Sequence, residues 1–155
     1  MNELLVGKLA SIERCVKRIR ETWEKPTGLP FEQDFDKQDI IMLNLQRAFE
    51  TLLDIGNHLV RARKLGWPEN SAATFTLLEQ ADIITLEMMA KLKAMAGMRN
   101  IIVHRYQDID QAKVEQVVEH HLDELIEMAQ TIISRAPGSI VTLDLPGNGN
   151  DLGGK

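Results

Sequence analysis

The sequence predicts an all-α helical bundle, and three observations support this fold class. Apolar residues recur at spacings of three and four through most of the chain, the period of an amphipathic helix. Hydrophobic residues make up 44% of the 155 residues and only 5% are aromatic, a composition that favours helices. Proline and glycine are gathered in short stretches between the periodic segments, where they end helices. The length fits one domain with a single core.

The first two predicted helices are long. Residues 2–22 carry one apolar stripe and are expected to lie with a charged face outward. Pro26, Gly28 and Pro30 interrupt the pattern, because prolines remove backbone donors and glycine permits turns. A second helix is predicted over 37–65. Its apolar residues occupy more than one stripe, so we expect it at the centre of the bundle.

Three further helices complete the predicted bundle of about five. They cover 71–80 with Ser71 as N-cap, 82–104, and 110–135 with Asp110 as N-cap. Pro137 and Gly138 end the last one. We therefore expect a helical-bundle domain over 1–136 and a flexible tail over 137–155, where a short β-like stretch precedes residues rich in Gly and Asn.

The composition limits the class of protein. The single cysteine, Cys15, cannot form an internal disulfide, and no apolar run reaches membrane-spanning length, so a cytoplasmic protein is expected. The net charge of −5 means that any nucleic-acid binding depends on a local basic patch. The candidates form two groups: Arg61, Arg63 and Lys64, and Lys91, Lys93, Arg99 and Arg105.

The stretch RNIIVHRY, residues 99–106, ends the fourth predicted helix with an unusual set of polar side chains. Arg99 falls within the same arc of the helix as an apolar stripe. Burying a guanidinium without a partner costs several kcal/mol. Removing one partner of a buried ion pair likewise destabilises a fold by about 3–5 kcal/mol. We therefore expect a carboxylate on the second helix, Asp54 or Glu50, to pair with it.

Asn100 and His104 are four residues apart and share a different face of that helix, where the amide is expected to hydrogen-bond the imidazole. Small and apolar residues, including Gly97, lie near the same face. This pattern predicts a second contact surface, interpreted as a homodimer interface. Arg99 and His104 are about 140° apart on a regular helix, so they converge only if the helix frays or two protomers meet.

Metal and cofactor sites are not predicted. Asp54 and His58 form an i,i+4 pair, but two ligands are too few for a closed zinc site. Glycine-rich phosphate-binding loops of the Walker or Rossmann kind are absent from the sequence.

The residues of RNIIVHRY resemble the motif of HEPN-domain proteins, an Arg followed after four residues by a His and two residues later by a Tyr. They are most similar to the HepT-like toxins of bacterial and archaeal toxin–antitoxin pairs, in which a polar residue such as Asn100 usually follows the Arg. The similarity extends to AMAGMRN, to NLQRAFETLLDIGNHLV and to the DID that opens the last helix. It covers roughly residues 1–135.

The resemblance implies a toxin of a type VII-like HEPN/MNT system, a metal-independent endoribonuclease that cleaves RNA, with tRNA among its candidate substrates. It implies a homodimer in which the motifs of two protomers face a common cleft. Arg99 and His104 would be catalytic and Asn100 would support them. A minimal nucleotidyltransferase (MNT) antitoxin would transfer AMP to Tyr106 and silence the toxin.

The residue types suit this chemistry. Histidine can move protons between a 2′-hydroxyl and a leaving 5′-oxygen, and arginine can stabilise the charge that develops on the phosphorus centre. Two alternatives remain open at this stage. One is a catalytically silent HEPN module that binds a nucleotide or forms a dimeric interaction surface. The other is a helical adaptor in which Arg99 only stabilises the core.

Overall fold

The computed structural model describes residues 2–137, so all of the predicted tail over 137–155 except its first residue lies outside the described part. Within the described part there are α-helices and short 3-10 helices and no strands, which confirms the predicted all-α class. The elements are α1 (Glu3–Glu24), η1 (Phe31–Gln33), α2 (Phe35–Ala62), α3 (Ser71–Gln80), α4 (Leu86–His104), η2 (Tyr106–Asp108), α5 (Gln111–His120) and α6 (Leu122–Ser134).

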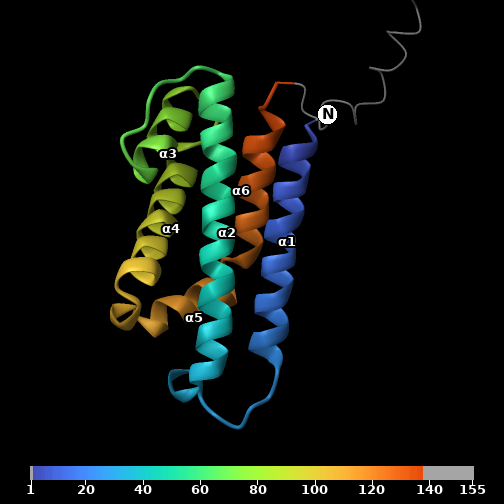
Figure 1. Ribbon diagram of the computed structural model, residues 1–155, viewed down its shortest axis with the longest axis vertical. Helices are drawn as coiled ribbons and strands as arrows, with labels where there is room; N and C mark the ends of the chain where they lie inside the picture. Colours follow the sequence, from blue (N-terminus) through green and yellow to red (C-terminus); the bar gives the residue numbers. More distant parts are fainter. Residues whose placement is uncertain (1, 138–155) are drawn as a thin grey trace, which may run out of the picture.

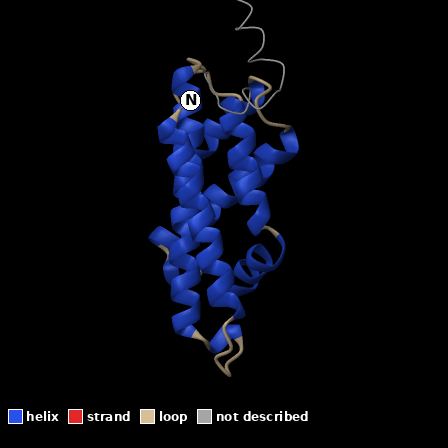
Figure 2. Ribbon diagram, turned by 90° about the vertical axis from the view of Figure 1, so that its right-hand side faces the viewer, coloured by secondary structure: helices blue, strands red, loops and turns tan. Residues whose placement is uncertain are grey.

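The long helix α2 is the centre of the bundle, as predicted. Figure 1 shows α1 and α6 beside one another on one side of α2, while α3 and α4 cover its other side. The shorter helix α5 runs across the direction of the long helices and joins the α4 side to α6. Figure 2 shows the same arrangement from a second direction, with helices packed along the long axis.

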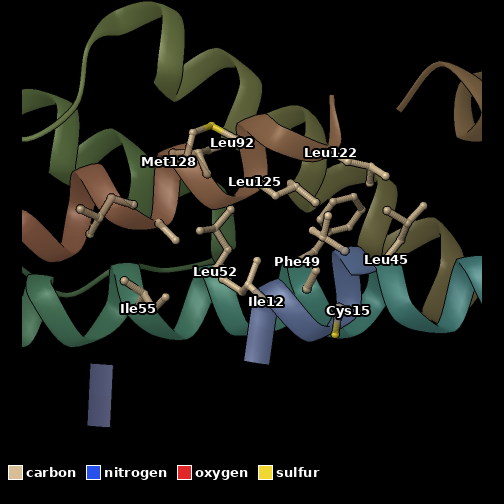
Figure 3. Close-up of a cluster of buried hydrophobic side chains, with 14 of the residues drawn as sticks. Ile12, Cys15, Leu45, Phe49, Leu52, Ile55, Leu92, Leu122, Leu125 and Met128 are labelled. Atoms are coloured by element: carbon tan, nitrogen blue, oxygen red, sulfur yellow. The ribbon is translucent and has the colours of Figure 1, made fainter. Parts of the chain in front are cut away.

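One contiguous core holds these helices together. Figure 3 shows Ile12 of α1, Leu52 of α2, Leu92 of α4 and Leu125 of α6 meeting between the helices. Each of these side chains is at most 1% exposed. Removing an aliphatic side chain of this size from water stabilises the fold by about 1.5–3 kcal/mol. No described helix combines the length and the apolar character needed to cross a membrane.

Side-chain caps fix the start of most helices, and three starts differ from the prediction. The second helix begins at Phe35 instead of residue 37, with Asp34 as its cap. Asn70, not Ser71, caps α3 by accepting from the Ala73 N–H at 2.9 Å. The fourth helix begins at Leu86 rather than at Asp82, with Thr85 as its cap. Asp82 has φ 59°, a left-handed conformation that cannot continue into a right-handed helix.

The predicted helix over 110–135 is in fact two helices, which gives six α-helices in residues 2–137 instead of about five. Asp110 is confirmed as the cap of the first, since its Oδ1 accepts from the Ala112 N–H at 2.9 Å. The helix ends at His120, and His121 with φ −127° starts the turn into α6. The spacing of buried apolar residues continues across this turn, so the sequence pattern did not reveal it.

The second helix also ends earlier than expected, at Ala62 instead of residue 65. Lys64 adopts φ 54°, which stops the helix by the same left-handed geometry. The Arg63 guanidinium donates a 2.7 Å hydrogen bond to the Arg135 carbonyl oxygen and so ties this turn to the end of α6.

Candidate functional site

The polar residues of the motif gather at the C-terminal end of α4. Arg99 and Asn100 lie in its last turns, and His104 is its final residue. The backbone N–H of Arg105 closes the helix with a 2.8 Å bond to the Ile101 carbonyl. Tyr106 then begins the short helix η2. The change of direction at Arg105, with φ −142° and ψ 53°, separates the tyrosine from the regular helix.

Arg99 is paired with a carboxylate of α2, as the sequence predicted. Its Nε and Nη2 donate to Glu50 Oε2 at 2.9 and 2.7 Å. The other candidate, Asp54, pairs instead with Lys8 of α1 at 3.5 Å. The Arg99 and Glu50 side chains are 29% and 37% exposed, so the ion pair is half-buried and remains accessible from outside.

The predicted bond between Asn100 and His104 is absent among the described hydrogen bonds. Asn100 Oδ1 instead accepts from Arg99 Nη1 at 3.2 Å, while Asn100 and His104 are both exposed. Glu50 and Asn100 thus hold the Arg99 guanidinium from two sides. Within one chain Asn100 therefore orients Arg99, and the exposed His104 side chain does not contact the Asn100 amide.

The face of α4 that carries His104 is uncovered in a single chain. Gly97 lies on it, and a Cβ atom added there would meet no other atom within 4 Å. Leu86, which shares this face at the other end of the helix, is 65% exposed. The cavity that Arg99 helps to line has a volume of only about 10 Å³, roughly enough for one water molecule. A substrate therefore has to approach from the open surface.

Tyr106 contacts α2 at a residue that the sequence interpretation missed. Its hydroxyl donates a hydrogen bond to Asp39 Oδ1, 67 residues earlier in the chain. Partial burial of the phenol, followed by the adjacent Asp39 carboxylate, raises the pKa of Tyr106 to about 12. The side chain is still 42% exposed, so its hydroxyl is held in place without being enclosed.

The basic residues near the motif are only partly available. Lys91 lies 3.5 Å from Glu124 of α6 and 4.0 Å from Glu87, so carboxylates offset its charge. Arg105, between His104 and Tyr106 of the motif, is exposed. Among residues 2–137 no group of three or more His, Cys, Asp or Glu side chains is placed to hold a metal ion.

Comparison with known proteins places these features in a family. A family profile described as "Ribonuclease HepT-like" matches residues 12–132. The chain is 43% identical over 132 residues to the mRNA nuclease HepT of Shewanella oneidensis. The matched region covers 85% of this chain and 98% of that protein. It is 29% identical over 90 residues to the tRNA nuclease HepT of Aphanizomenon flos-aquae, covering 58% of this chain and 61% of the other.

Solved structures agree with the sequence relationship. The structure of a tri-AMPylated Shewanella oneidensis HEPN toxin in complex with MNT antitoxin superposes with a TM-score of 0.80 and 42% identity. The match covers 87% of this chain and all of that toxin. The predicted resemblance is thereby confirmed, and the chain belongs to the HepT-like ribonuclease family of HEPN-domain proteins.

Proposed function

We propose that this protein is the toxin of a HEPN/MNT toxin–antitoxin pair and that it cleaves RNA without a metal ion. The observation that carries the proposal is the placement of an accessible arginine and an accessible histidine at the open end of α4, in a chain of the HepT-like family. Since the proposed substrate is RNA, we propose that the protein acts in the cytoplasm.

His104 and Arg99 have complementary roles in the proposed reaction. An imidazole takes the proton of the ribose 2′-hydroxyl, whose oxygen attacks the adjacent phosphorus, and an imidazolium returns a proton to the departing 5′-oxygen. The products are a 2′,3′-cyclic phosphate and a 5′-hydroxyl, and DNA is not a substrate because it lacks the attacking group. The Arg99 guanidinium stabilises the additional negative charge on the phosphoryl oxygens.

The active unit is a homodimer in this proposal. Arg99 turns toward Glu50 of α2, whereas His104 lies on the uncovered face of α4, so one chain does not bring them together around a small pocket. Gly97 permits a second helix backbone to approach that face closely. Two facing copies of α4 would place the arginine and histidine of both protomers along one cleft.

Tyr106 is the proposed target of the antitoxin. It lies two residues after His104, and its hydroxyl is accessible at the same end of α4. An AMP group on that oxygen would add an anionic phosphodiester and a bulky nucleoside at the end of α4 that carries His104, where they would obstruct the proposed cleft. The Shewanella oneidensis toxin that superposes on this chain is AMPylated and bound to an MNT antitoxin, which supports the assignment.

Metal-free cleavage of RNA by the purified full-length chain tests the proposal. In buffer that contains a metal chelator, the wild-type protein should cut an RNA substrate and leave 2′,3′-cyclic phosphate ends. A DNA oligonucleotide of the same sequence should stay intact. His104→Ala should abolish cutting without loss of thermal stability, because the side chain is exposed. His120→Ala, an exposed histidine on α5, is the matched control and should cut normally. Cleavage that requires a divalent ion, or an inert wild type, would contradict the proposal.

One observation favours a second candidate, a catalytically silent HEPN module. Arg99 is already neutralised by Glu50, an arrangement that also suits a purely structural ion pair. The two candidate functions differ in whether the protein cleaves RNA. A silent module would bind a nucleotide or a second protomer with wild-type His104 in place and release no cleavage product.

A further inference from the structure

The loop between α2 and α3 exposes a tryptophan that the proposed catalytic site does not use. Trp67 is 95% exposed, the highest value among the large apolar side chains of residues 2–137. An indole left in water adds none of the burial free energy that tryptophans usually contribute to folding. The Trp67 ring is therefore available for contact with another molecule.

The backbone around Trp67 is fixed by the fold. Arg63 is bonded to the Arg135 carbonyl at 2.7 Å, Lys64 has φ 54° and Gly66 has φ 141°. A Cβ atom at Gly66 would lie 3.4 Å from Leu77 of α3, which shows how closely the loop rests on that helix. The indole is thus presented on a constrained turn.

Trp67 forms one wall of a groove of about 730 Å³. The exposed side chains of Arg61 and Lys64 line the same groove, together with the amide of Asn57. No carboxylate is among the described residues that line it. The groove therefore combines two positive charges and one flat aromatic surface in a protein whose net charge is −5.

We propose that this groove is a second RNA-contact site, in which one unpaired base stacks on Trp67 and the neighbouring phosphates contact Arg61 and Lys64. Aromatic stacking combined with cations along the backbone is the general way in which proteins hold single-stranded nucleic acids. The groove suits a stacked base better than an apolar partner, because Val60 and Pro68 are the only aliphatic side chains among its described lining residues and Val60 is 1% exposed.

The position of the groove gives it a role distinct from the chemistry. Arg61 follows Glu50 by eleven residues on α2, about 16 Å along the axis at 1.5 Å per residue. Figure 1 shows this loop at the end of α2 opposite η1. The inference rests on the proposed ribonuclease function, and it adds that a long substrate is held away from the scissile bond. Loss of the groove should raise KM for long RNA and leave kcat unchanged.

Tryptophan fluorescence of the full-length chain tests the contact directly. The chain has two tryptophans, so Trp23→Phe leaves Trp67 as the only one. With His104→Ala added to prevent cleavage, titration with a single-stranded oligouridylate in low salt should quench the remaining emission. Trp67→Ala should weaken binding by about five-fold or more, the range expected for loss of one stacked base. Phe35→Ala removes another exposed aromatic, at the far end of α2, and should leave affinity unchanged.

The charges are tested with a matched pair of double variants. Arg61→Gln with Lys64→Asn should weaken RNA binding and reduce its salt dependence, and asparagine suits the positive φ of residue 64. Lys17→Gln with Arg18→Gln removes two exposed charges from α1 and should have a smaller effect. Unquenched Trp67 together with wild-type affinity in Trp67→Ala would overturn the inference, as would quenching by the antitoxin protein but not by RNA.

Cleavage assays separate failure of this inference from failure of the proposed function. If otherwise wild-type protein and Trp67→Ala cut long RNA with equal KM, the groove is not an RNA site while the ribonuclease stands. If the wild type cuts no RNA, the proposed function fails, and this inference fails with it. A raised KM for long RNA, with unchanged turnover of a dinucleotide, is the expected result.

Discussion

Asp39 accepts the hydroxyl hydrogen of Tyr106 and so connects the first turns of α2 to the residue that follows the end of α4. Tyr106 is the only tyrosine of the chain, which makes its ionisation and its modification directly measurable. The contact holds the hydroxyl at a defined place on the surface and keeps it protonated. An AMP group transferred to that oxygen would have to break the hydrogen bond to Asp39.

Replacing Asp39 by asparagine should lower the pKa of Tyr106 from about 12 toward the ordinary value of about 10. A carboxylate beside the phenol disfavours the tyrosinate, so its removal favours ionisation at lower pH. Partial burial remains and should keep the pKa above its ordinary value. Ultraviolet titration of tyrosinate absorbance measures this with one tyrosine in the chain. An unchanged midpoint in Asp39→Asn would show that the carboxylate has no influence.

Tyr106→Phe should retain RNA cleavage but resist silencing by the antitoxin. The substitution removes the acceptor oxygen for AMP and leaves Arg99 and His104 in place. Intact-mass spectra after incubation with the MNT protein and ATP should show added AMP on the wild type and none on the variant, and peptide mapping should place it at Tyr106. Full silencing of the phenylalanine variant would mean that inhibition works through binding alone.

Arg99→Ala should destabilise the fold by only about 1 kcal/mol. Both partners of the Arg99–Glu50 pair are about one-third exposed, so water replaces the lost contact more readily than in a closed core. The helical-adaptor alternative instead requires the loss of about 3–5 kcal/mol that accompanies a broken buried ion pair. Urea unfolding distinguishes these values. A small loss of stability together with complete loss of cleavage would assign Arg99 to the reaction.

Much of the fold could be predicted because local sequence determined it. The apolar period located the helices, and the Arg99 position within an apolar stripe required a carboxylate on α2, which is Glu50. The turn at His121 could not be predicted, since the buried positions keep helical spacing through it. The misplaced starts of α3 and α4 share a cause, because several residues before each helix are suitable caps and only the backbone conformation selects Asn70 and Thr85.

The candidate site was only partly predictable for a different reason. The motif residues are close in sequence, but their partners are not. Asp39 is 67 residues from Tyr106, and nothing in the pattern around this aspartate distinguishes it from other exposed acidic residues. The prediction paired Asn100 with His104 from helical spacing alone. Within one chain the amide oxygen of Asn100 instead accepts a hydrogen bond from the adjacent Arg99 guanidinium.

Gly97→Arg should convert the proposed dimer to a monomer and abolish RNA cleavage without unfolding the chain. A Cβ atom at this position meets nothing within 4 Å, so the larger side chain is accommodated in the monomer, and replacing glycine inside a helix stabilises it by up to about 1 kcal/mol. In a dimer that brings two α4 helices together, the same side chain would lie between the backbones.

Light scattering during size-exclusion chromatography measures the mass, and thermal unfolding measures the stability. Gly7→Arg is the matched control, because Gly7 also lies on an exposed helix surface, in α1, with nothing within 4 Å of an added Cβ. The control should stay dimeric and active. A Gly97→Arg protein that remains an active dimer would show that the α4 face is not the interface, and that each chain aligns Arg99 and His104 on RNA by itself.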